Sequence, residues 1–211
     1  MISLVALYPN HLNLNGDLAN IKVLQRRLSW RGVESTIRLV EKGKSIPSDC
    51  DFILIGHGSE AAWNDIEEDF DQASNAVAEL FTNGLPGLAV ASGYERLARL
   101  QLGAPVAPGN GLARTERVSK FALASIDGHQ ALGYINSDAA LEPLVRYGNV
   151  FGTLLHGPVL AKNEWLAETL IRAIFDRRGL PLPPIMAKEK ADQVADLISK
   201  VWELEEPLAR E

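Results

Sequence analysis

One segment of the chain constrains the fold more than any other, a short apolar run that leads through a sharp turn into a helix. Residues Leu85–Val90 have the composition of a buried strand, and residues 91–97 turn into a stretch rich in Ala, Leu and Arg. This is the shape of a nucleophile elbow, in which the apex side chain stands above the sheet and the following backbone N–H groups stabilise negative charge. The apex position is Ala91, which cannot act as a nucleophile.

Short β-rich runs alternate with amphipathic helical patterns over the rest of the chain. This alternation predicts an α/β fold with a doubly wound, mostly parallel sheet. We expect the parallel strands to cover residues 3–7, 34–39, 52–55, 85–90 and 150–155, with short antiparallel strands inserted over 109–150. Further helices are expected over 17–30, 65–83, 163–178 and 187–204.

Two details of the helices follow from capping and charge. Asp17 is expected to cap the helix that it precedes, and the acidic residues 65–71 are expected to form a first turn, where they suit the helix dipole. The length of 211 residues predicts one domain over 1–180, followed over 181–211 by a linker and a C-terminal helix. That helix is expected to pack on the domain or on a partner, because Val194, Leu197, Ile198 and Val201 recur at helical spacing.

Composition excludes several classes of function. A formal net charge of -6 gives no broad basic surface, which argues against nucleic acid or anionic lipid as the main partner. Cys50 is the single cysteine, so we expect no internal disulfide and no cysteine-based metal cluster, and interpret the thiol as a packing group. The chain has no apolar run long enough to span a bilayer and its start lacks signal-peptide features, so we expect a cytoplasmic protein without membrane insertion. We also expect no metal and no cofactor.

Polar residues follow several of the expected strands. In open α/β sheets, sites form at the carboxyl ends of strands. Asn15-Gly16-Asp17, Gly56-His57-Gly58, Ala91-Ser92-Gly93-Tyr94 and His156-Gly157-Pro158 all lie at such ends. A lone histidine is more often structural than catalytic, but the place of His156 at a strand end before Gly-Pro favours a functional role.

Three motifs in order give the chain a strong resemblance to a known family. They are the opening segment LYPNHLNLNGDLANI at 7–21, DCDFILIGHG at 49–58 and FGTLLHGPVLAKN at 151–163. Together they resemble class I glutamine amidotransferases of the cobyric acid synthase (CobB/CobQ) type, and most closely the GatD subunits of lipid II isoglutaminyl synthase. The resemblance implies a flavodoxin-like sheet.

The resemblance also implies a reaction and a partner. In such enzymes a cysteine thiolate, deprotonated by a histidine, attacks the glutamine carboxamide, and backbone N–H groups hold the oxyanion. The released ammonia passes to a synthase, which for GatD resembles a Mur ligase, MurT, that activates the D-glutamate carboxylate of lipid II. The implied site holds His156 as the base, with oxyanion and substrate contacts from Gly56, His57, Gly58, Ser92, Tyr94 and Asn136. The family resemblance suggests that the partner supplies the acid that orients the histidine.

The chain departs from the family at the elbow and in the middle segment. The family elbow reads Cys-Gly-Gly-Tyr-Gln, whereas this chain has Ala91, Ser92 and Glu95 in place of Cys, Gly and Gln. Asn136 matches a glutamine-binding block, but no arginine accompanies it. Three explanations remain open: an engineered Cys→Ala variant of an active glutaminase, a nucleophile shifted to Ser92, whose hydroxyl would have to face His156, and a natural pseudo-glutaminase, which we favour.

A chain without glutaminase chemistry still has possible functions. It could hold a MurT-like ligase in its active arrangement as a heterodimer, supply an acceptor for free ammonia or regulate a second, active amidotransferase. Alternatively, it could sense an amino acid such as glutamine in a vestigial pocket between His57, Tyr94 and His156.

Overall fold

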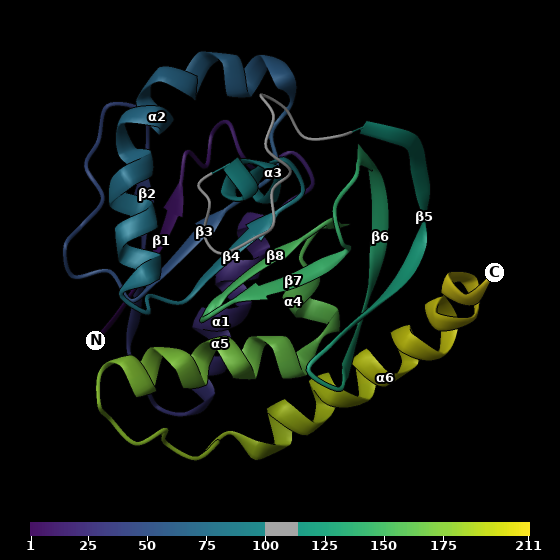
Figure 1. The fold of residues 1–211 in the computed structure, drawn as a ribbon. Helices are drawn as coiled ribbons and strands as arrows, with labels where there is room; N and C mark the ends of the chain where they lie inside the picture. Colours follow the sequence, from purple (N-terminus) through teal and green to yellow (C-terminus); the bar gives the residue numbers. More distant parts are fainter. Residues whose placement is uncertain (100–113) are drawn as a thin grey trace.

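A six-stranded sheet forms the centre of the molecule. The computed structural model describes residues 1–99 and 114–211 (Figure 1). The strand order is β2-β1-β3-β4-β8-β7, in which the first five strands are parallel and β7 is an antiparallel edge. The strands are β1 (Ile2–Leu7), β2 (Ser35–Val40), β3 (Phe52–Ile55), β4 (Gly87–Val90), β7 (Leu144–Tyr147) and β8 (Val150–Thr153). The order of the parallel strands is flavodoxin-like, so the predicted doubly wound sheet is confirmed.

Helices cover both faces of the sheet, as right-handed crossovers require. α1 (Leu18–Trp30) and α5 (Glu164–Arg177) contact each other on one face, and α2 (Glu60–Thr82) and α3 (Ser92–Arg99) lie on the other (Figure 1). Each of the three longer helices buries an apolar stripe, for example Ile21, Leu24 and Leu28 of α1. None of the helices in the part of the chain that the structure describes is long and apolar enough to cross a bilayer.

The start of α2 corrects one prediction. The helix begins at Glu60, because the Ser59 side chain caps it by accepting a hydrogen bond from Ala62 N. The acidic residues 65–71 therefore do not form a first turn. Two of them bind other loops: Asp65 pairs with Lys42, and Asp69 accepts a hydrogen bond from the Tyr8 hydroxyl at 2.8 Å.

A long hairpin replaces the expected short antiparallel strands. β5 (Arg114–Ile126) and β6 (His129–Ala139) pair over most of their length, while the expected residues 109–113 lie outside the described part. The strand expected over 150–155 divides into β8, in the main sheet, and β9 (Leu155–His156), which pairs with β6. His156 therefore lies at the join between the two sheets.

The last helices connect the hairpin to the main domain. α4 (Val159–Lys162) precedes α5, and α6 (Lys188–Arg210) runs along β5 (Figure 1). Trp202 Nε1 donates a hydrogen bond to the Lys162 carbonyl, whereas Leu197 is 60% exposed. One side of α6 thus packs on its own domain, and the division into 1–180 and 181–211 stays a prediction.

Candidate functional site

Three loops converge at the carboxyl edge of the sheet and approach closely enough to require glycine. A Cβ atom at Gly56 would lie 2.0 Å from the Leu12 carbonyl oxygen, and one at Gly58 would lie 2.8 Å from the His11 carbonyl oxygen. A Cβ at Gly93 would lie 2.6 Å from the carbonyl oxygens of Ile55 and Gly56. These glycines are therefore needed for backbone packing between the 8–16 loop, the 56–58 turn and the elbow.

The elbow keeps the backbone of a strained turn. Ala91 has φ +48°, in the left-handed region that residues with a Cβ rarely adopt. Its N–H donates to the Thr153 carbonyl at 2.7 Å, and its side chain is only 2% exposed. The turn geometry of an elbow is thus present, but its apex is a covered methyl group.

The Ser92 hydroxyl is the centre of a dense hydrogen-bond cluster. It accepts from Trp63 Nε1 at 2.7 Å and from Gly58 N at 3.0 Å, and lies 3.0 Å from the Gly58 carbonyl oxygen. It also lies 2.9 Å from His57 Nδ1. The hydroxyl has one proton to donate, so its hydrogen-bonding capacity is filled within the protein. It is hydrogen-bonded to His57 and not to His156.

The backbone N–H groups around the elbow are also hydrogen-bonded within the chain. His57 N donates to Asp17 Oδ2 at 3.0 Å, Gly58 N to the Ser92 hydroxyl at 3.0 Å, and Ser92 N to His57 Nδ1 at 3.3 Å. An oxyanion hole requires N–H groups that point at the reacting atom without another acceptor. The donors of His57, Gly58 and Ser92 do not meet that requirement in this arrangement.

His57 and His156 meet edge to face, with ring centroids 4.8 Å apart and an interplanar angle of 84°. Burial, reinforced by the neighbouring His156, lowers the pKa of His57 to about 4. Burial also lowers the pKa of His156, with Arg117 acting in the same direction and the Asn136 backbone opposing it. Both imidazoles are therefore neutral at pH 7.

The histidine side of the site keeps unused bonding capacity. His156 Nδ1 is hydrogen-bonded to the Asn15 side chain, which fixes the ring against the 8–16 loop. Its Nε2 atom is buried and makes no hydrogen bond of normal geometry among the described residues. A neutral imidazole whose Nε2 atom has no side-chain partner among the described residues could still accept or donate a proton.

Asp17 carries a fully buried carboxyl group beside the backbone of His57. Asp17 occupies the N-cap position of α1, as predicted, but its side chain makes no capping hydrogen bond; instead it accepts from the backbone of the 56–58 turn through His57 N. Burial raises the pKa of Asp17 to about 6, although hydrogen bonds from backbone N–H groups act in the opposite direction. The opening motif marks the position of Asp17 but not this role, because its partner His57 lies 40 residues away along the chain.

Asn136 has an arginine neighbour that its own strand does not supply. Arg117 of β5 donates to Asn136 Oδ1 at 3.0 Å across the hairpin. Glu95, the other altered elbow residue, forms an ion pair with Arg114 at 3.0 Å. Only the strand register, which pairs Ser119 with Asn136, reveals that these cations reach the site.

Tyr94 is not brought to the histidine pair. It is 1% exposed, and its ring packs so closely on Gly152 that a Cβ there would lie 2.3 Å from Tyr94 Cδ2. Burial, together with the Tyr147 hydroxyl, raises the pKa of Tyr94 well above its usual range. Its predicted part in a ligand pocket with His57 and His156 therefore has no support from this placement.

The architecture defines the class of fold. A flavodoxin-like sheet with an antiparallel hairpin and an elbow after β4 is class I glutamine amidotransferase-like, as the sequence predicts. A chain of the solved PurLQS structure from Thermotoga maritima superposes with a TM-score of 0.51 at 12% identity, covering 83% of this chain and 98% of the other. Within residues 1–99 and 114–211, no cluster of three or more His, Cys, Asp or Glu side chains could hold a metal ion.

Curated relatives narrow the similarity further. The chain is 25% identical over 220 residues to the GatD subunit of lipid II isoglutaminyl synthase (glutamine-hydrolyzing) from Staphylococcus aureus, covering 90% of this chain and 89% of the relative. It is 22% identical over 242 residues to the GatD subunit from Streptococcus pneumoniae, covering 94% and 92%. No protein-family model matches the chain. The resemblance to GatD is thus confirmed, while the CobB/CobQ type stays a prediction.

Proposed function

We propose that the chain is a GatD-like subunit of a complex that amidates lipid II during peptidoglycan synthesis, and that it does not hydrolyse glutamine itself. Similarity to two GatD subunits along about nine-tenths of the chain supports the first part. The expected partner is a Mur-ligase-like subunit in the cytoplasm. In this arrangement the chain holds the ligase in its active form, and ammonia comes from solution or from another amidotransferase.

The Ser92 cluster is the observation that carries the second part. Ala91 removes the nucleophile, but it is Ser92 that binds Trp63 and Gly58 and leaves the N–H groups of the turn occupied. Glu95 likewise has its own partner, Arg114. Ser92 and Glu95 therefore both have partners within the chain, which supports a natural pseudo-glutaminase over a single engineered Cys→Ala change.

A glutaminase assay on the complex with the Mur-ligase-like subunit tests this proposal. We expect no glutamate release from glutamine with the unmodified chain or with Ala91→Cys, because the variant regains a thiol but not free oxyanion donors. The double variant Ala91→Cys/Ser92→Gly also removes the hydroxyl that binds Gly58 N. Its glutamate release is compared with that of Ala91→Cys. Turnover by the unmodified chain would overturn the proposal, and turnover by Ala91→Cys alone would show that one lost side chain silenced an otherwise complete site.

A further inference from the structure

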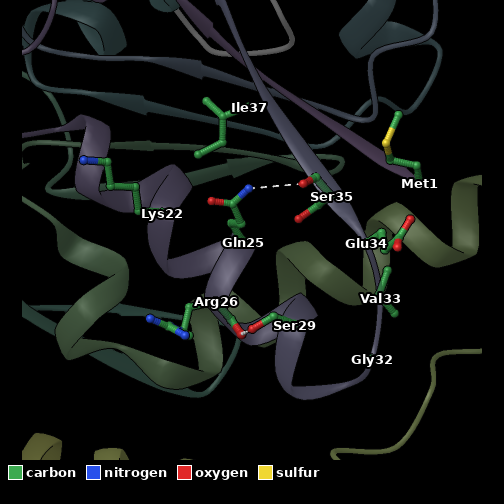
Figure 2. A pocket seen from close by; sticks show the side chains of 10 residues that line it. All are labelled: Met1, Lys22, Gln25, Arg26, Ser29, Gly32, Val33, Glu34, Ser35 and Ile37. Carbon is green, nitrogen blue, oxygen red and sulfur yellow. Dashed lines mark hydrogen bonds between the residues drawn. The ribbon is translucent and has the colours of Figure 1, made fainter.

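A groove lies between α1 and the edge strand β2, remote from the elbow and the histidine pair. It has a volume of about 870 Å³ and is lined by Lys22, Gln25 and Arg26 of α1 and by Ser35 and Ile37 of β2, among others (Figure 2). β2 ends the sheet, so no further strand covers this side within the described residues. The site at the carboxyl edge of the sheet does not use any of these side chains.

The α1 wall of the groove is positively charged. Lys22 and Arg26 are one helical turn apart and exposed, and neither has a carboxylate oxygen within 4.0 Å among residues 1–99 and 114–211. Glu34 also borders the groove, but near Met1, away from Lys22 (Figure 2). In a chain of net charge -6, this pair of cations favours an acidic occupant.

The β2 wall presents an edge whose outward backbone groups pair with no other strand among residues 1–99 and 114–211. The carbonyls of Glu34 and Val40 accept hydrogen bonds from β1 residues, so the even-numbered residues of β2 face β1 and the odd-numbered residues face outward. The outward Ser35 carbonyl accepts a hydrogen bond from Gln25 Nε2 at 3.2 Å, as Figure 2 shows. The N–H and C=O groups of Ile37 and Leu39 also point outward, and the Leu39 side chain is 56% exposed. Such an edge is a template for an added strand.

We propose that this groove docks an extended, acidic segment of the Mur-ligase-like partner, which adds as a strand to the outer edge of β2. The proposal rests on the proposed function for the identity of the partner, but its evidence is separate from the elbow. Carboxylates of the segment pair with Lys22 and Arg26, and its backbone bonds to Ile37 and Leu39. An anionic membrane surface does not fit, because the net charge of the chain is negative and the cations lie in a concave groove.

The backbone contact is tested with Ile37→Pro, measured against Ile37→Ala. Proline removes the outward N–H of residue 37 without removing a hydrogen bond between β1 and β2, and edge strands tolerate it in this orientation. Both variants lose the Ile37 side chain, and only one loses the donor. We expect the affinity of the full chain for the purified Mur-ligase-like subunit to fall about ten-fold more for Ile37→Pro than for Ile37→Ala. Equal affinities of the two variants would contradict strand addition.

Charge reversal provides a second test that does not depend on the fold of a proline variant. Lys22→Glu/Arg26→Glu is compared with Lys44→Glu/Lys120→Glu, a pair with the same charge change at exposed lysines outside the groove. We expect the groove pair to weaken binding by about ten-fold or more and to flatten its salt dependence, with a much smaller effect of the control pair. Equal effects of both pairs would overturn the proposal.

The same measurements separate the two hypotheses. If the unmodified chain does not bind the Mur-ligase-like subunit, the proposed function fails. If it binds and the groove variants bind equally well, the function stands and the docking site is wrong. If the chain alone forms a dimer that Lys22→Glu/Arg26→Glu dissociates, the occupant is a second copy and the assignment to the ligase is overturned.

Discussion

The elbow side and the histidine side of the site differ in how their polar groups are hydrogen-bonded. On the elbow side, Ser92, Gly58 and the N–H of His57 all have partners inside the chain. On the histidine side, His156 is held by Asn15 but leaves Nε2 without a normal hydrogen bond among the described residues. The elbow is thus held by several hydrogen bonds within the chain, whereas the His156 side chain is held by one neighbouring side chain, that of Asn15.

The largest expected effect comes from removing the Ser92 hydroxyl. Ser92→Ala leaves Trp63 Nε1 and Gly58 N without their acceptor in a largely buried setting, so we expect the free energy of unfolding to fall by about 2–3 kcal/mol. Ser125→Ala, at an exposed position of β5, is the matched control and should change it by less than about 0.5 kcal/mol. Chemical denaturation measures both; equal effects would show that the hydrogen bonds of Ser92 do not stabilise the elbow side.

The second prediction concerns pH. Burial raises the pKa of Asp17 to about 6, so the stability that this group contributes is present below the ordinary carboxyl value of 3.8 and is lost as pH rises through 6. Burial lowers the pKa of His57 to about 4, so its contribution is present above the ordinary value of 6.5 and is lost as pH falls through 4. The two dependences oppose each other between pH 4 and 6.

If one of the two groups is replaced by a residue that does not titrate, the pH dependence of stability should follow the remaining group. Relative to the unmodified chain, Asp17→Asn is expected to gain up to about 2 kcal/mol of stability between pH 4 and pH 7, because the amide cannot ionise. His57→Gln should show the reverse trend over the same range. Denaturation midpoints and slopes at intervals of pH measure the effect, and three parallel profiles would show that neither group titrates in this way.

A smaller effect is expected at the elbow apex. Ala91→Gly should raise the free energy of unfolding by up to about 1 kcal/mol, because glycine adopts φ +48° without the steric cost that a Cβ brings. The greater freedom of glycine in the unfolded chain offsets part of this gain. Ala89→Gly, at a strand position with a normal backbone, is the control and should destabilise. If both variants destabilise equally, the apex is not strained.

The smallest stability effect is expected on the histidine side. Asn15→Ala removes a hydrogen bond to His156, but Asn15 is exposed and water can replace it, so we expect a loss of about 0.5 kcal/mol. The variant should instead broaden or shift the imidazole signals of His156 in NMR spectra, since the ring loses its anchor. A loss as large as that of Ser92→Ala would mean that both sides of the site are equally tied into the fold.

Hydrophobic patterning predicted the elements whose burial is simple. β1, β3 and α5 lie within a residue or so of the expected ranges because strands buried on both faces and amphipathic helices carry a strong pattern. The acidic residues 65–71 predicted a later start for α2, because a first turn rich in carboxylates is typical of a helix N-terminus, whereas the Ser59 cap sets the start at Glu60. Element boundaries of this kind depend on one side-chain hydrogen bond.

The site was harder to predict because its decisive contacts join distant residues. The residues that surround Ser92 include Trp63, 29 positions away, and no local pattern marks that tryptophan as its partner. Arg117 reaches Asn136 only through the hairpin register, which the sequence did not give in advance. Motif similarity located the positions of the site, but their present bonding depends on the packed structure.

The close contact of Gly93 with the carbonyl groups of Ile55 and Gly56 has a consequence for the apex beside it. This contact holds the start of α3 against the end of β3 whatever side chain residue 91 carries. The backbone conformation of the turn is therefore fixed by its neighbours, and a substitution of residue 91 should leave that backbone in place. Because the Ala91 side chain is only 2% exposed, a larger side chain at this position has to displace the atoms that cover it rather than move the turn.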